Sequence, residues 1–176
     1  MPTRNSRAVV FLACILLPLL AVAFSGGCVG YTLGTSLPKG ITSIYIPTFV
    51  NKCEKPQVEI EATRAAIEEF QKDGTLEITS EEYAKSVVEV TLLKYKLETI
   101  RFNQDQNKTA MEYRQSITAS IVFRRQRTDE TLSKRTVTGE STFIVSGDLP
   151  TQERLALPAT CKNLAHYIVS GVVEYW

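Results

Sequence analysis

The stretch YRQSITASIVFR, residues 113–124, alternates two kinds of side chain with a period of two. One register is apolar and consists of Tyr113, Ile117, Ala119, Ile121 and Phe123. The other register is polar and consists of Arg114, Ser116, Thr118, Ser120 and Arg124. A period of two is that of a β-strand, and antiparallel sheets allow one buried and one solvated face. The stretch therefore predicts a half-buried strand.

Long strands are predicted on both sides of this stretch. Residues 87–102 alternate as well, but the apolar side chains change register in the middle, so we expect a bulge or sharp twist near Leu92. Residues 103–111 form the turn between the two strands. After a reversal around residues 127–134, residues 137–145 return as the last long strand.

The segment before these strands predicts a strand, a helix and a second, short strand. Residues 41–50 are rich in β-branched side chains and predict a strand that ends at or soon after Pro47. Residues 56–74 repeat their apolar side chains at helical spacing, with Gly74 as the C-terminal stop. Residues 75–79 predict the short strand.

A second amphipathic helix is predicted over residues 147–176. Its expected buried stripe is Leu157, Cys161, Leu164, Ile168, Val172 and Tyr175. Pro158 is expected to kink or restart it. Together the elements predict an α+β fold, with two amphipathic helices on one face of a mainly antiparallel sheet of four to five strands, a two-layer sandwich.

The N-terminus has the features of an export signal. Residues 8–24 are apolar and uncharged, follow Arg4 and Arg7, and end at Ser25-Gly26-Gly27-Cys28. The run is short for a membrane span, for which about 20 residues are needed, and suits a secretory signal. Small residues before a cysteine resemble the bacterial lipobox, although Ser25 replaces the usual aliphatic residue. Lipidation of Cys28 is therefore predicted, against an ordinary cleaved signal or an uncut anchor.

Lipidation would define three segments of the chain. Residues 1–27 form the signal peptide, which is removed. Residues 28–40 form a lipidated tether that is rich in turn-forming residues, and residues 41–176 form a single domain. Several acyl chains on Cys28 would anchor the domain stably. Because no Asp follows Cys28, the outer membrane is the expected location, and no cofactor beyond this covalent lipid is expected.

The charge balance and the cysteines exclude several classes of function. The chain has 20 basic and 19 acidic residues, so no overall basic field suggests nucleic acid. Outside the signal and its lipobox, only Cys53 and Cys161 remain. They either form a disulfide in an exported compartment or are a loop thiol and a small core residue. One histidine and no paired-cysteine spacing exclude a zinc site.

No pattern in the sequence predicts catalysis. His166 is the only histidine, and a lone helical histidine is far more often structural than catalytic. The sequence has no nucleophile elbow, dinucleotide-binding motif or phosphate-binding loop. We therefore expect a protein that is not an enzyme and holds no metal.

A basic cluster is predicted at one hairpin, around a turn that contains Asp129 and Glu130. Its members are Arg124, Arg125, Arg127, Lys134 and Arg135. Arginine binds phosphate oxygens in a bidentate manner, so the cluster suggests a phosphate-bearing lipid as its ligand. The alternative is a solvated hairpin end whose charges discourage edge pairing.

The whole mature chain resembles one known family. The lipobox cysteine is followed by GYTLGTSLPKGITSIYIPTFVNK, then by a helix that ends IEEFQKDGTLEI, and the chain closes with GDLPTQERLALPATCKNLAHYIVSGVVEYW. This pattern is similar to that of the LptE family of lipopolysaccharide-assembly lipoproteins.

The resemblance implies a fold and a function. Members fold as two helices on a sheet of about four strands and sit in the lumen of an outer-membrane β-barrel, LptD, as plug and assembly partner. They bind lipopolysaccharide and help deliver it to the outer leaflet, which would give the basic cluster its ligand. A second hypothesis remains, namely a periplasmic lipoprotein that regulates a cell-wall enzyme by docking.

Overall fold

The computed structural model describes residues 37–38, 40–102 and 110–174, all of which belong to the compact unit Thr35–Trp176. The predictions for the signal peptide, for Cys28 and for Tyr175 lie outside the described residues, as do residues 103–109 of the turn predicted at residues 103–111. The last two residues of that predicted turn, Ala110 and Met111, instead begin strand β5 (Ala110–Arg125). Within the described ranges, no helix is long and apolar enough to cross a membrane.

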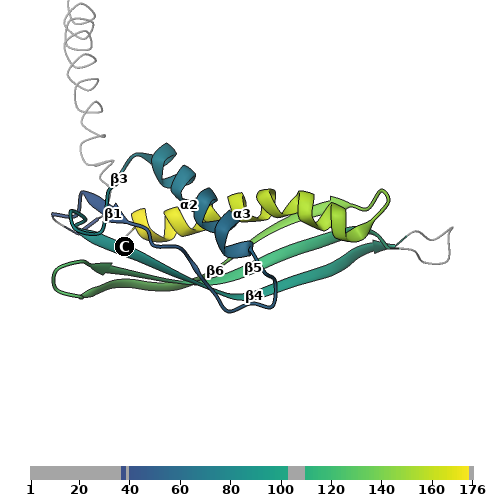
Figure 1. Ribbon diagram of the computed structural model, residues 1–176, viewed down its shortest axis with the longest axis horizontal. Coiled ribbons are helices and arrows are strands. Elements are labelled where there is room, and N and C mark those ends of the chain that lie inside the picture. The colour runs from purple at the N-terminus through teal and green to yellow at the C-terminus, as the bar shows by residue number, and fades with distance from the viewer. Residues whose placement is uncertain (1–36, 39, 103–109, 175–176) are drawn as a thin grey trace, which may run out of the picture. The chain divides into compact units, whose positions relative to one another are not determined.

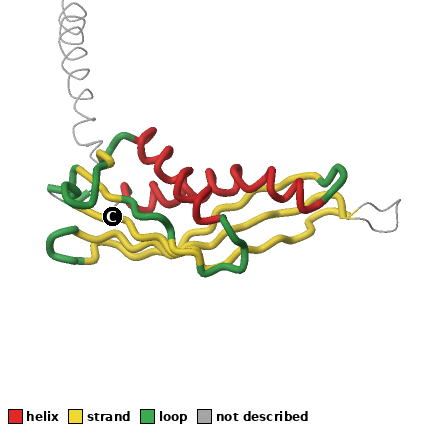
Figure 2. Tube along the Cα trace, viewed as in Figure 1, coloured by secondary structure: helices red, strands yellow, loops and turns green. Residues whose placement is uncertain are grey.

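The described residues form two helices and six strands (Figures 1 and 2). In chain order they are β1 (Ser43–Tyr45), β2 (Val50–Asn51), α2 (Val58–Asp73), β3 (Glu77–Ile78), β4 (Ser86–Phe102), β5 (Ala110–Arg125), β6 (Thr131–Ile144) and α3 (Leu149–Val173). The strands form one sheet in the order β3-β1-β4-β5-β6, and β2 pairs separately with β4. Both helices lie on the same face of this sheet (Figure 1).

This arrangement confirms the α+β two-layer fold but changes the description of the sheet, which is mixed. The long strands β4, β5 and β6 pair antiparallel, as predicted. The short strands β1, β2 and β3 pair in parallel, β1 with β3 and with β4, and β2 with β4. The strand predicted over residues 41–50 is divided around Pro47. The chain then returns from β1 to β3 through helix α2, and such a crossover restores the original strand direction.

The change of register in β4 is a bulge. Leu92 pairs with Ala119, and the next paired residue, Lys94, lies opposite Thr118, so Leu93 is the extra residue. Because one residue is inserted, Tyr95 returns to the face that Leu92 occupies. The bulge was predicted near Leu92 and is confirmed.

The ends of the two helices follow from local sequence signals. Gly74 ends α2 with φ 71°, and its N–H donates to the carbonyl of Phe70 at 3.1 Å. The side chain of Asp148 caps α3 by accepting from the N–H of Thr151 at 3.0 Å. Helix α3 is continuous through Pro158, so this proline does not restart the helix as was considered.

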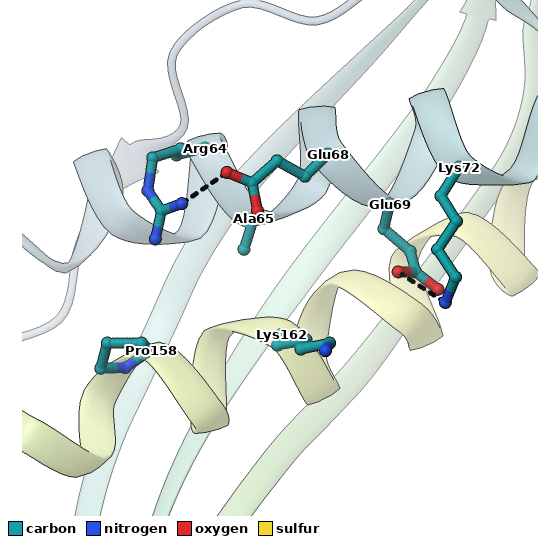
Figure 3. Close-up of a pocket in the computed structure, with 7 residues that line it drawn as sticks. All are labelled: Arg64, Ala65, Glu68, Glu69, Lys72, Pro158 and Lys162. Carbon is teal, nitrogen blue, oxygen red and sulfur yellow. Dashed lines mark hydrogen bonds and ion pairs between the residues drawn. The ribbon is translucent and has the colours of Figure 1, made fainter.

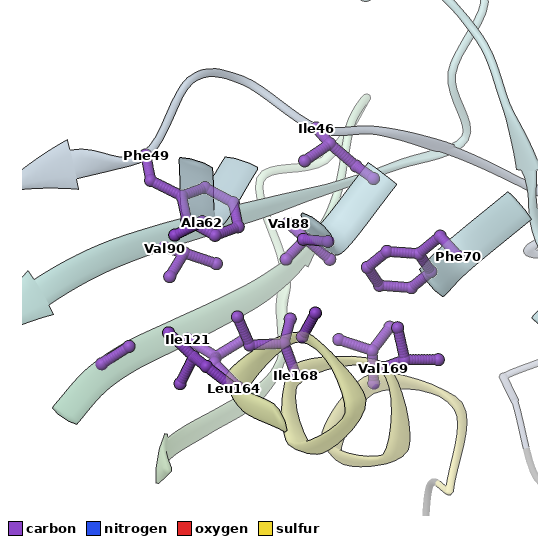
Figure 4. Packing of buried hydrophobic residues seen from close by; sticks show 14 of the residues in the cluster. Ile46, Phe49, Ala62, Phe70, Val88, Val90, Ile121, Leu164, Ile168 and Val169 are labelled. Atoms are coloured by element: carbon purple, nitrogen blue, oxygen red, sulfur yellow. The ribbon is translucent and has the colours of Figure 1, made fainter. Parts of the chain in front are cut away.

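The core lies between the helices and the sheet (Figure 4). Phe70 of α2 and Leu164 and Ile168 of α3 are fully buried, together with Val88 and Phe123 of the sheet. Gly139 of β6 lies so close to Leu164 that a Cβ there would overlap the backbone of α3. Helix α3 therefore lies directly on β6.

Candidate functional site

The five basic residues of the predicted cluster lie on the hairpin formed by β5 and β6. Arg124 and Arg125 end β5, Arg127 lies in the turn, and Lys134 and Arg135 belong to β6. The hairpin end is also next to the beginning of the domain. Arg125 pairs with Ser86 of β4, and Ser86 pairs with Ile44 of β1.

Acidic neighbours neutralise the first two arginines. Arg124 forms ion pairs with Glu89 of β4 and with Asp129 of the turn. The hydrogen bonds to Glu89 and Asp129 raise the pKa of Arg124 above its ordinary value. Arg125 pairs with Glu130 at 3.3 Å. These two guanidinium groups are therefore already engaged within the hairpin.

The remaining members point to different faces of the sheet. Arg135 lies opposite the buried Ile121, on the helix-covered face, and its Cδ approaches Gly171 of α3. Lys134 lies opposite Val122 and points to the uncovered face. Arg127 and Lys134 are both exposed, and the described residues offer neither of them an ion pair. A ligand anion would therefore meet these two charges first.

The two cysteines considered for a disulfide are both free thiols. Cys53 lies in the loop before α2, where its N–H donates to Oδ1 of Asn51 at 2.9 Å. Cys161 is fully buried on α3, and burial raises the pKa of its thiol to about 12. Cys53 is thus a loop thiol and Cys161 a small core residue, which was the alternative to a disulfide, and no disulfide joins them.

A buried polar network, which sequence reasoning missed, lies beneath the first turns of α3. At its centre is Gln115, which is fully buried on β5. Its Nε2 donates to the hydroxyl of Tyr95 at 2.7 Å, and its Oε1 accepts from Thr160 at 2.8 Å. The Tyr95 hydroxyl donates to Glu153, which also accepts from Nζ of Lys55 at 2.6 Å. The sequence contained one sign of this network, because Gln115 is a polar residue in the apolar register of residues 113–124.

The network perturbs two of its acidic groups. Burial, together with the hydrogen bond to Glu153, raises the pKa of Tyr95 above its ordinary value. Desolvation works to raise the pKa of Glu153, but the hydrogen bonds from Lys55 and Tyr95 outweigh it and lower that pKa below its ordinary value of 4.5. A neutral Tyr95 and an ionised Glu153 are thus the stable partners at neutral pH.

Replacing Glu153 with glutamine is expected to cost about 1–2 kcal/mol of unfolding free energy at pH 7, since a charged hydrogen-bond partner is lost. A lowered pKa in the folded state stabilises the fold above the unfolded-state pKa, and this stabilisation is lost as the pH falls through the folded-state value. The difference between wild type and Glu153→Gln should therefore shrink between pH 6 and pH 3 in urea titrations. Glu68→Gln, the same change at an exposed glutamate, is the control. A difference in unfolding free energy between wild type and Glu153→Gln that does not change with pH would contradict the role of Glu153.

A shallow groove runs between α2 and α3 on the solvent side, and one hollow in it has a volume of about 310 Å³ (Figure 3). Its charges are mixed, with Arg64 paired to Glu68 and Lys72 paired to Glu69. His166 lies further along the groove, where Nδ1 is 3.5 Å from Glu69. Among the described residues, no group of His, Cys, Asp and Glu side chains could hold a metal ion. Lys162 also lines the hollow, and the described residues give it no ion pair, so basic side chains slightly outnumber acidic ones there.

Comparison with known proteins gives one family and several similar folds. The family model described as LptE, lipopolysaccharide-assembly, matches residues 41–170. No curated protein matches the chain.

Solved structures with the same fold come from several bacteria. A hypothetical protein from Chlamydia trachomatis is 11% identical with a TM-score of 0.55, over 77% of this chain and 97% of its own. A Xanthomonas campestris protein is 8% identical with a TM-score of 0.54, over 80% and 88%. A minor lipoprotein from Acinetobacter baumannii is 13% identical with a TM-score of 0.50, over 75% and 92%. At these identities the likeness concerns the fold alone.

Proposed function

Because the chain belongs to the LptE family of lipopolysaccharide-assembly proteins, we propose that it plugs and helps assemble an LptD-type β-barrel in the outer membrane. In this proposal it is anchored to the periplasmic face of that membrane by lipid on Cys28. It binds lipopolysaccharide for delivery to the outer leaflet, and it catalyses no reaction. The match of the family model over residues 41–170 carries the proposal.

The uncovered face of the sheet supports the role of a plug. Both helices lie on the other face, so no described helix covers the outward register of β4, β5 and β6 (Figure 1). On this face the centre of the sheet is rich in hydroxyl groups, and Oγ1 of Thr118 lies 3.0 Å from Oγ1 of Thr138 across the strands. The interior of an outer-membrane barrel is polar. A polar face of this kind suits such a lumen better than an apolar surface would.

The basic cluster supports lipopolysaccharide binding, with unequal roles for its members. Arg127 and Lys134 are exposed without an acidic partner among the described residues, whereas Arg124 and Arg125 must exchange an ion pair for a ligand phosphate. Arg135 lies on the helix-covered face. We therefore assign the first contact with lipid phosphates to Arg127 and Lys134.

Replacing Arg127 and Lys134 together with alanine is expected to weaken lipopolysaccharide binding about tenfold at low salt. Each exposed charge contact contributes up to about 1 kcal/mol, and salt screens such contacts over about 8–10 Å. The loss should therefore shrink between about 20 mM and 500 mM salt. Binding is measured by fluorescence titration with purified lipopolysaccharide.

The matched control is the double change of Lys52 and Lys94 to alanine, which removes the same charge elsewhere on the surface. An equal loss in both double variants would show that net charge, and not the hairpin, determines binding. Replacing Arg124, Arg125 and Arg127 together should also weaken binding more at low salt than at high salt.

A further inference from the structure

Strand β6 (Thr131–Ile144) is an edge strand, since the sheet ends with it after β5. A single hydrogen bond shows which of its backbone groups point away from β5. The N–H of Glu140 donates to Oδ1 of Asn163 on α3 at 2.8 Å. Because backbone groups alternate in direction along a strand, those of Lys134, Thr136 and Thr138 point to the same open edge.

The open edge has two different halves. Helix α3 covers the inner face of both halves, but only in the half around Glu140 does it reach the edge, where Asn163 satisfies the N–H of Glu140 at 2.8 Å. In the half from Lys134 to Thr138, the described part of the chain supplies no partner for the edge-facing backbone groups. A long unpaired edge of this kind is a template for strand addition.

We infer that an extended, acidic segment of the barrel partner adds to the sheet as a strand along β6 between Lys134 and Thr138. This inference rests on the proposed function. The five-residue span suits a strand of ordinary length. Strand addition would satisfy the free N–H and C=O groups of Lys134, Thr136 and Thr138, and it would leave the contact between Asn163 and Glu140 intact.

The charge of this half of the edge selects an acidic segment. Lys134 is exposed on the uncovered face, and the described residues give it no ion pair. Arg127 is exposed in the turn at the same end of the hairpin. Opposite charges across neighbouring strands stabilise a pair by up to about 1 kcal/mol, and like charges oppose it. An Asp or Glu opposite Lys134 is therefore favoured. Lipid phosphates would then meet Arg127, and Lys134 would be available to them only while the added strand is absent.

The position of α3 disfavours a second copy of this chain as the partner. Gly139 allows α3 to lie directly on β6, and Asn163 of α3 reaches the edge itself. Two copies paired through β6 would bring their α3 helices to about the spacing of neighbouring strands, about 4.8 Å. Packed helices need 8–10 Å between their axes. An extended segment without a covering helix avoids this clash.

The test uses proline at an edge-facing position. Thr136→Pro removes an N–H that points away from β5, so the hydrogen bonds between β5 and β6 are kept. An added strand would lose the hydrogen bond to this N–H and would clash with the proline ring. Thr136→Val changes the side chain alone and is the matched control. With full-length, membrane-extracted chain and the LptD-family barrel of the same cell, Thr136→Pro should bind about tenfold or more weakly, and Thr136→Val should bind like wild type.

Two further measurements keep the test independent of folding defects in the proline variant. Lys134→Glu should weaken the complex severalfold, whereas Lys94→Glu, a similar change away from the edge, should not. Hydrogen exchange of the Lys134, Thr136 and Thr138 amides should slow at least tenfold when the barrel is bound. Unchanged binding by Thr136→Pro and Lys134→Glu with unprotected amides would overturn strand addition alone. Failure of the wild-type chain to bind the barrel would overturn the proposed function as well.

Discussion

Replacing Gly139 with alanine is expected to destabilise the domain by about 3 kcal/mol, at the upper end of the costs of overpacking a core. An added Cβ at this position would overlap the backbone N and Cα of Leu164 on α3. Backbone atoms cannot move aside as a flexible side chain can, so α3 would have to shift away from β6. That shift would also loosen the buried contacts of Leu164 and Ile168. The measurement is the free energy of unfolding from urea titrations.

Gly171→Ala is the matched control because it makes the same chemical change within α3. There the nearest neighbour of the new Cβ is Cδ1 of Ile121 at 3.6 Å, an ordinary contact. Alanine favours a helix over glycine by about 1 kcal/mol, so this variant should be as stable as wild type or more so. If Gly139→Ala is as stable as Gly171→Ala, helix α3 does not lie on β6 as described.

Replacing Cys28 with alanine is expected to abolish labelling by radioactive palmitate and to release the domain from membranes. Each buried methylene of an acyl chain contributes about 0.8 kcal/mol to membrane binding, and two or more chains are needed for stable anchoring. Removal of the acceptor thiol removes all of these chains at once. The measurements are metabolic labelling followed by separation of membrane and soluble fractions.

Two other cysteines provide the controls for this experiment. Cys14→Ala changes a thiol within the predicted signal, and Cys53→Ala changes a free thiol of the folded domain. Both variants should be labelled like wild type. Continued labelling of the Cys28 variant would disprove lipidation at this residue, even if the protein stayed on the membrane.

The antiparallel part of the fold was predictable because its signals are local. The alternation of residues 113–124 identified β5, and the change of register near Leu92 identified the bulge in β4. Gly74 marked the end of α2. The direction of the short strands was not predictable in this way, since β1 and β2 pair with β4 only after α2 has reversed the chain.

The site was less predictable than the fold because its partners are distant in sequence. The five basic residues were found as a group, but Glu89, which neutralises Arg124, lies on the neighbouring strand 35 positions away. Lys134 and Arg135 are adjacent on a strand and so point to opposite faces, but only the register of β6 with β5 shows that Arg135 is the one on the helix-covered face. The network around Gln115 joins side chains from separate elements, and a polar residue in an apolar register was its only sign in the sequence.

Purification of the full-length chain from its native membrane in mild detergent tests the proposed function most directly. An outer-membrane β-barrel of the LptD type should be recovered with it in constant proportion, and this barrel should be lost from the membrane of cells that lack the chain. Recovery of a peptidoglycan synthase without any barrel would contradict the account and support the docking regulator instead.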